Sequence, residues 1–127
     1  MHHSRLSTFV FDCKVGDLEA AAEFWSKALN RELLPPEPDE PNYLRLAASE
    51  DEPILYVQKV DHDSRIHLDI ESDDLEAEVA RLEKLGARRI KFVRRWWVME
   101  APTGQVFCVL NPLRGPLAGK PNANAWP

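Results

Sequence analysis

Residues 66–87, IHLDIESDDLEAEVARLEKLGA, place a short strand directly before an amphipathic helix. Residues 66–70 are rich in isoleucine and leucine and predict the strand. A capping box from Asp73 to Glu76 predicts where the helix begins, and Gly86 predicts where it ends. One face of this helix carries the apolar residues Leu75, Val79, Leu82 and Leu85. The stretch therefore predicts a β-α unit with one buried helix face.

The same order of elements occurs earlier in the chain, so the sequence contains a repeat. The tetrapeptide Asp-Leu-Glu-Ala stands where each helix begins, at residues 17–20 and 74–77. The other predicted elements are a helix of about three turns from Asp17 and strands at residues 8–11, 43–46, 54–57, 88–99 and 105–110. Each half thus has a predicted β-α-β-β(-β) order.

Neither half can form a hydrophobic core alone, because about 55 residues bury too little apolar surface. We expect the halves to pack together, with a concave face lined by side chains opposite the helices. The 127 residues have the length of one domain. Residues 1–112 are therefore predicted to form a single domain, with modules at roughly 6–60 and 64–112 and an extended tail at 113–127.

Composition excludes several classes of protein. The chain is 44% hydrophobic and 29% charged, which is typical of a globular domain. Its apolar runs are too short to span a membrane, and residues 1–5 do not resemble a signal peptide, so we expect a cytoplasmic protein. The net charge of −5 argues against nucleic-acid binding and favours neutral or cationic small ligands. Cys13 and Cys108 lie in apolar segments and are expected to be reduced and buried.

The segments that carry a resemblance lie mainly in the second half. They are IHLDI at 66–70, Asp74 seven residues after His67, the helix to Ala87, Trp97, and APTGQVFCVL at 101–110. They resemble the second module of the vicinal oxygen chelate superfamily, in its glyoxalase, bleomycin resistance and dioxygenase group. The first half matches through Asp17-Leu18 and Phe24-Trp25. The resemblance implies an α+β fold of two β-α-β-β-β modules, which form a curved mixed sheet around a ligand cavity, commonly in a homodimer.

Metal-dependent members of this superfamily carry a His or Gln on the first strand of a module and a Glu on its last strand. His67 matches the first of these positions, but Cys108 replaces the glutamate. In the first module the equivalent places are Val10, with Thr8 nearby, and residues 55–57, which include no carboxylate. One histidine without carboxylates holds a divalent metal poorly, so we expect no metal cofactor. The alternative is one divalent ion bound at His67.

His67 has three interpretations. It is the candidate catalytic residue, because the pKa of a histidine suits proton transfer near neutral pH. With Asp69, two residues later on one strand face, it has the spacing of a His-x-Asp metal pair. The favoured interpretation is that His67 lines the cavity and makes a hydrogen bond to Asp69 or to the backbone. Cys108 could act as a nucleophile, although core packing is favoured for Cys108 and for Cys13.

Aromatic residues on the predicted strands suggest an apolar cavity wall with few polar groups. Trp96 and Trp97 must point to opposite faces, and the resemblance makes Trp97 the inward one. The predicted ligand-binding residues are His67, Asp69, Trp97, Tyr56, Cys108 and Phe9.

Three further segments have open interpretations. The basic run 88–95 is favoured as a solvated strand that protects a sheet edge, over a nucleic-acid surface or an arginine that binds a ligand anion. No regular element is expected after Pro112. Trp126 either docks on its own domain or a partner subunit, or belongs to a disordered end. His2 and His3 are assigned to a mobile end.

The sequence therefore predicts a protein that binds a small aromatic or cationic molecule at a degraded metal site, either sequestering or modifying it. The alternative is a metal-dependent lyase, isomerase or dioxygenase, for which fold analogy is a weak warrant. A third class is an interaction module that uses the basic strand or the Trp126 tail.

Overall fold

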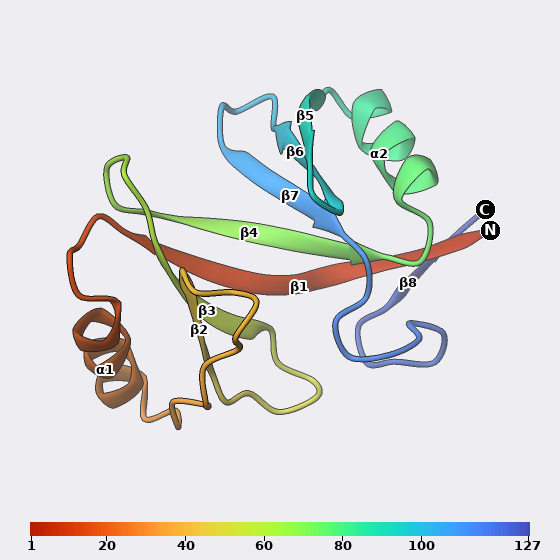
Figure 1. The fold of residues 1–127 in the computed structure, drawn as a ribbon. Helices are drawn as coiled ribbons and strands as arrows, with labels where there is room; N and C mark the ends of the chain where they lie inside the picture. The colour runs from red at the N-terminus through yellow and green to blue at the C-terminus, as the bar shows by residue number, and fades with distance from the viewer. The chain divides into compact units, whose positions relative to one another are not determined.

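The computed structural model describes residues 1–127, which divide into two compact units. The first unit is Thr8–His67, and the second unit combines Met1–Ser7 with Leu68–Pro127. The elements are β1 (His2–Cys13), α1 (Leu18–Leu29), β2 (Tyr43–Leu46), β3 (Ile54–Lys59), β4 (Arg65–Ser72), α2 (Leu75–Lys84), β5 (Arg88–Val93), β6 (Trp96–Glu100), β7 (Val106–Leu110) and β8 (Asn124–Trp126) (Figure 1). Neither helix has the length and hydrophobicity needed to cross a membrane.

In the first unit, β3 lies between β1 and β2. It pairs in parallel with β1, with Phe9 opposite Leu55, and antiparallel with β2. One face of these strands packs against α1, and its buried cluster is Phe11, Cys13, Leu18, Ala22, Leu44 and Val57. Because side chains alternate along a strand, the neighbouring residues belong to the other face, which we call the distal face. Its members are Thr8, Val10, Asp12, Tyr43, Arg45, Ile54, Tyr56 and Gln58.

The second unit repeats this plan. β4 pairs in parallel with β7, and β6 pairs antiparallel with both β7 and β5. The core beneath α2 consists of Val79, Leu82, Met99, Phe107 and Val109. Each unit therefore has a mixed sheet with one helix on one face, which confirms the predicted α+β class and the repeated module.

The shared tetrapeptide is a helix-capping signal. Asp17 and Asp74 are the N-cap residues of the two helices, and each carboxylate accepts a hydrogen bond from the backbone N–H three residues later, at 3.1 Å in both cases. The predicted capping box from Asp73 to Glu76 is wrong. Asp73 instead accepts the backbone N–H of His3 at 2.7 Å, which directs its carboxylate away from the helix. Gly86 ends α2 with φ of +108°, a conformation that glycine adopts without strain.

The chain ends are more ordered than the sequence predicted. Residues 2–4 of β1 pair antiparallel with β8, so the expectation that no regular element follows Pro112 is wrong for residues 124–126. Trp126 docks on its own unit, where its Nε1–H donates to Ser4 Oγ at 2.8 Å. The buried Arg5 side chain also binds the carbonyl of Pro121 at 2.9 Å and holds the preceding part of the tail.

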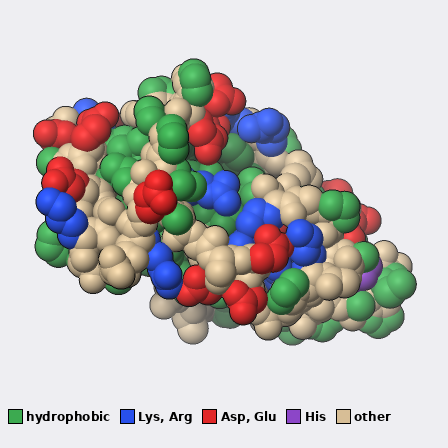
Figure 2. All heavy atoms as spheres, turned by 90° about the horizontal axis from the view of Figure 1, so that it is seen from below, with side chains coloured by type: hydrophobic (Ala, Val, Ile, Leu, Met, Phe, Trp, Pro, Cys, Tyr) green, Lys and Arg blue, Asp and Glu red, His purple; other side chains and the backbone are tan.

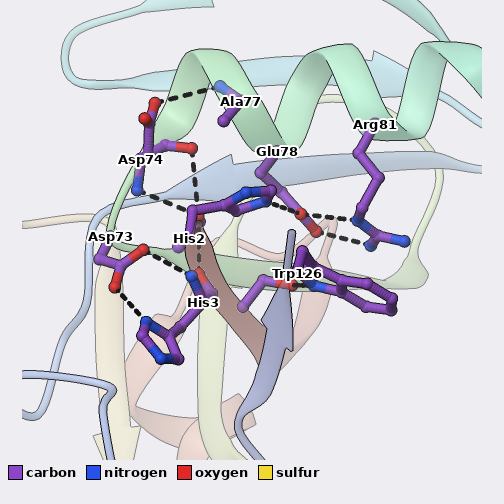
Figure 3. A network of polar contacts seen from close by, with 10 residues as sticks. His2, His3, Asp73, Asp74, Ala77, Glu78, Arg81 and Trp126 are labelled. Atoms are coloured by element: carbon purple, nitrogen blue, oxygen red, sulfur yellow. Dashed lines mark hydrogen bonds and ion pairs between the residues drawn. The ribbon is translucent and has the colours of Figure 1, made fainter.

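A buried polar network joins the N-terminal residues to α2 (Figure 3). Glu78 is fully buried, and its carboxylate accepts hydrogen bonds from Arg81 at 2.8 Å through both oxygens. His2 Nε2 lies 2.9 Å from the same carboxylate, and the Arg81 guanidinium lies 3.9 Å from the centre of the Trp126 ring. His2 is 6% exposed, so its assignment to a mobile end is wrong.

Candidate functional site

The candidate site of the first unit is centred on His67. Its Nδ1 lies 2.7 Å from Oδ2 of Asp12, a side chain that is 1% exposed. Arg65 Nε donates to the same oxygen at 3.3 Å. Asp12 lies one residue before the end of β1, while His67 and Arg65 come from the beginning of β4. The pair thus joins residues 55 positions apart in the chain.

This geometry selects the tautomer of a neutral His67 side chain. A carboxylate accepts hydrogen bonds, so the hydrogen of the neutral ring resides on Nδ1 and the lone pair on Nε2. A fixed imidazole with a basic Nε2 can take a proton from a ligand O–H or N–H group, and return it from the same atom. The other oxygen of Asp12, Oδ1, is buried and has no hydrogen-bond partner. Asp12 therefore orients the histidine through Oδ2 alone.

A row of polar and aromatic side chains continues from this pair across the distal face. Gln58 lies opposite Asp12 in the β1–β3 register and donates to the Tyr43 hydroxyl at 2.8 Å. Tyr43 and Tyr56 form an edge-to-face pair with ring centroids 5.9 Å apart. The Arg45 guanidinium lies 6.0 Å from the centre of the Tyr56 ring. The face thus combines aromatic surface with a few positioned polar groups, which is the usual composition of a small-molecule site.

The environment of Tyr56 keeps its hydroxyl neutral. Burial raises the pKa of Tyr56, and the carboxylate of Glu37 raises it further, while Arg45 acts in the opposite direction. A neutral phenol is both a donor and an acceptor of hydrogen bonds. Tyr56 can therefore bind a polar ligand group without carrying charge.

The predicted site residues fall on different faces. In the first unit, His67 contacts Asp12 on the distal face, and Tyr56 shares that face, whereas Phe9 lies on the α1 side with Leu55. In the second unit, Asp69 lies opposite Cys108 in the β4–β7 register, on the face away from α2. Trp97 packs instead against the core beneath α2. The two units thus present the predicted residues in two groups, with Phe9 and Trp97 on the helix sides.

The partner of His67 is Asp12, whereas the sequence predicted Asp69 or the backbone. The available signal was a single acidic residue in the run Phe9-Val10-Phe11-Asp12-Cys13, where every neighbour is apolar. A carboxylate within a buried strand needs a partner, because burial of an unpaired charge is costly. That reasoning identifies Asp12 as a site residue but does not reveal which donor it contacts.

The residues around His67 do not fit the metal site of the superfamily. Thr8, Val10 and Tyr56 supply no imidazole or carboxylate, and Oδ2 of Asp12 already accepts from His67 and Arg65. In the second unit, the carboxylate of Asp69 on β4 and the thiol of Cys108 on β7 are potential metal donors, and the two residues lie opposite each other in the β4–β7 register. A thiol is a soft donor that suits zinc better than manganese or magnesium.

The cysteines are free thiols. Burial raises the pKa of Cys13, and the nearby Asp12 carboxylate raises it further. Nucleophilic cysteines need a lowered pKa, so the environment of Cys13 favours packing over reactivity.

The basic run 88–95 is partly neutralised within its own unit. Arg88 pairs with Glu100 at 2.7 Å, and Arg89 contacts Glu76 and Glu83 of α2. β5 is bulged at Arg89 to Lys91, a feature that protects sheet edges from pairing. Elsewhere, Figure 2 shows acidic and basic side chains interspersed over the face that it displays.

Comparison with known proteins identifies the family to which the chain belongs. Residues 8–110 match the family model described as the glyoxalase-like domain. This match spans most of the chain, and the chain therefore belongs to the glyoxalase-like domain family, which confirms the resemblance to the vicinal oxygen chelate superfamily. Among curated proteins, no sequence matches.

Solved structures share the fold at low sequence identity. A hypothetical protein from Bacillus halodurans C-125 aligns with a TM-score of 0.63 at 12% identity, over 89% of this chain and 97% of its own. The Mn(II)-bound glyoxalase from Novosphingobium aromaticivorans aligns at 0.60 and 17% identity, over 84% of this chain and 38% of its own. Methylmalonyl-CoA epimerase from Mycobacterium tuberculosis aligns at 0.56 and 17% identity, over 88% of this chain and 89% of its own. Because one fold hosts many activities, these alignments define the architecture alone.

Proposed function

We propose that this glyoxalase-like protein binds a small, partly apolar organic molecule on the distal face of the first unit. The observation that carries the proposal is the His67–Asp12 hydrogen bond at 2.7 Å, beside the aromatic pair of Tyr43 and Tyr56. An oriented imidazole next to aromatic surface suits a planar ligand with a polar hydrogen-bonding group. Sequestration of such a molecule needs no further group.

Modification of the ligand would use His67 as the acid–base group. Asp12 fixes the ring, and Nε2 exchanges a proton with the bound molecule. Asp69 and Cys108 on β4 and β7 are proposed as further ligand contacts, in line with their place on the face away from α2. We also propose that the protein acts in the cytoplasm as a homodimer and binds neither nucleic acid nor membrane.

The second candidate function is a metal-dependent lyase, isomerase or dioxygenase. The observation in its favour is that Asp69 and Cys108, which lie opposite each other in the β4–β7 register of the second unit, offer a carboxylate and a thiol. A bound divalent ion would supply Lewis-acid chemistry there. The soft thiol makes zinc the ion to test first.

Metal analysis separates the two functions. Protein purified without a chelator or a metal-affinity step is analysed for metal, and its thermal stability is then measured with added Zn(II), Mn(II), Ni(II) and Fe(II). A ligand that binds the native state raises the melting temperature in proportion to its affinity. Stoichiometric metal, or a selective stabilisation that either Cys108→Ser or His67→Ala abolishes, would replace the metal-free proposal with the enzyme alternative.

A compound screen tests the binding face directly. Small aromatic and cationic compounds are screened by thermal shift, and each hit is remeasured with Tyr56→Ala and His67→Ala. Both changes should weaken binding at least about tenfold, since each removes a contact of the distal face. Phe92→Ala is the matched control, because Phe92 is an exposed aromatic residue of the second unit. Hits that Tyr56→Ala and His67→Ala leave unchanged would refute the proposed face.

A further inference from the structure

A separate pocket lies on the α1 side of the first unit. Its volume is about 190 Å³, and its lining consists of Phe9, Arg31, Ala48, Glu52, Pro53 and Leu55. Phe9 and Leu55 are direct partners in the β1–β3 register. Their strand neighbours Val10 and Tyr56 point to the distal face, so the sheet itself separates this pocket from the His67 site.

An ion pair between Arg31 and Glu52 forms the polar part of the pocket lining. Arg31 Nη2 lies 2.6 Å from Oε2 of Glu52. Glu52 is held by Ser49, whose backbone N–H and hydroxyl donate to Oε1 at 3.1 and 2.8 Å. Arg31 is held at the end of α1, where its N–H donates to the Ser26 carbonyl at 3.0 Å and its carbonyl accepts from the Ser26 hydroxyl. The Glu52 carboxylate and the backbone of Arg31 are therefore held without a ligand, and the Arg31 guanidinium is held by its ion pair with Glu52.

The wall beside Arg31 is equally well anchored. The segment after α1 pairs with the end of β2, because Leu34 N–H donates to the Arg45 carbonyl at 2.9 Å and Ala47 N–H donates to the Glu32 carbonyl at 2.8 Å. The pocket thus forms between hydrogen-bonded segments and is preorganised, which lowers the entropic cost of binding.

Size and lining restrict what can bind. An apolar protein cavity of about 150 Å³ is large enough to bind benzene. Most of the surface of this pocket is apolar, from Phe9, Leu55, Pro53 and Ala48. The pocket therefore has room for one ring of the occupant.

The ion pair restricts the charge of the occupant. Arg31 and Glu52 neutralise each other, so an anion would compete with Glu52 and a cation would compete with Arg31. A guanidinium has five N–H groups, and Glu52 accepts from one nitrogen of Arg31. The remaining donors suit a single neutral acceptor on the ligand, such as a carbonyl oxygen.

We propose that this pocket is a second small-molecule site, which takes a neutral monocyclic aromatic compound bearing one hydrogen-bond acceptor. The site goes beyond the function proposed for His67 and does not depend on it. Phe9 and Leu55 hold the ring, and Arg31 donates to the acceptor.

The test is a titration of ¹⁵N-labelled protein with acetophenone, followed by ¹H–¹⁵N NMR. Shifts should concentrate at the amides of Phe9, Ala48 and Leu55, and ethylbenzene, which lacks the acceptor, should bind at least about threefold more weakly. Arg31→Met should remove this preference. Absence of shifts at the lining amides, or shifts concentrated around Tyr43 and Tyr56, would overturn the proposal; the second pattern would instead locate acetophenone at the His67 site.

Filling the pocket is the stricter test. Leu55→Trp should weaken acetophenone binding at least about tenfold by occupying the ring position. Leu85→Trp is the matched control, since Leu85 is 66% exposed in the second unit, and it should bind like the wild type. If Leu55→Trp does not fold, Ala48→Leu fills the same space from a connecting segment and should have the same effect. Binding of wild-type strength in the folded filling variant would refute the assignment.

Discussion

Replacement of Glu78 by glutamine tests whether the buried network stabilises the second unit. Glu78 is fully buried, and its carboxylate receives two hydrogen bonds from Arg81 at 2.8 Å and one from His2 at 2.9 Å. Glutamine has nearly the same shape, but it keeps one acceptor oxygen and places an N–H₂ donor where the second oxygen was. The substitution thus leaves the Arg81 guanidinium without its counter-charge.

The expected loss follows from these contacts. A hydrogen bond to a charged group contributes about 1.5–3 kcal/mol, and removal of one partner of a buried ion pair costs about 3–5 kcal/mol. Arg81 is 26% exposed and can regain some hydration, so we expect a loss of about 3 kcal/mol in the free energy of unfolding. For a domain of this size that loss lowers the melting temperature by roughly 10 °C.

Urea denaturation followed by circular dichroism measures this change, and Glu76→Gln is the matched control. Glu76 lies on the same helix and pairs with Arg89, but its side chain is 68% exposed. Exposed ion pairs contribute at most about 1 kcal/mol, so the control should differ little from the wild type. A loss below about 1 kcal/mol in Glu78→Gln, or equal losses in the two variants, would refute the view that burial makes this network stabilising.

Three further predictions concern the second unit. Burial opposes ionisation of Glu78, but hydrogen bonds from Arg81, His2 and Ser4 outweigh it and lower the pKa of Glu78 below its ordinary value. The stabilisation is therefore present above the unfolded pKa and is lost as the pH falls. In urea titrations, wild-type protein should lose more stability than Glu78→Gln between roughly pH 5 and 3. Trp126→Ala should cost about 2 kcal/mol by thermal denaturation, because it removes the bond to Ser4 and the contact with Arg81, and an unchanged melting temperature would show that the tail does not stabilise the unit. Met99→Ala should cost about 3 kcal/mol in the same assay, since Met99 is fully buried beneath α2, and a cost below about 1 kcal/mol would mean that the core refills the space.

Local sequence signals predicted the elements well where one short segment determines the structure. Asp17 was predicted as an N-cap from its place before an apolar helix face, and the structure confirms it. Asp73 and Asp74 are adjacent acids, and each could serve as the N-cap of α2. His3, near the start of the chain, decides between them. His3 binds Asp73, which leaves Asp74 to cap α2. Within the helix segment, the capping-box pattern favours Asp73 and the tetrapeptide shared with the first helix favours Asp74, so the local signals disagree.

The two chain ends are likewise ordered by contacts between residues that are distant in the sequence. Residues 2–4 and 124–126 are short, and neither segment has a pattern that predicts a strand on its own. They are ordered by each other and by Glu78, which is in the middle of the sequence. Interactions between residues so far apart in the chain cannot be derived from local propensity, and Asp12 and His67, 55 positions apart, were not predicted as partners for the same reason.

The internal repeat explains why the helix caps were easier to predict from the sequence than the site residues. Asp17 and Asp74 occupy equivalent places in the two halves and perform the same task with the same geometry, so comparison of the halves supports the prediction of each. The site residues have no such counterpart, since His67 corresponds to Val10 in the first half and Cys108 to one of residues 55–57. Symmetric requirements, such as capping a helix, are met twice, whereas a binding site needs its polar groups once. Asp12 therefore has a partner that occurs once in the repeat, because the position equivalent to His67 in the first half is Val10. The Tyr56 and His67 variants test the binding face around this pair.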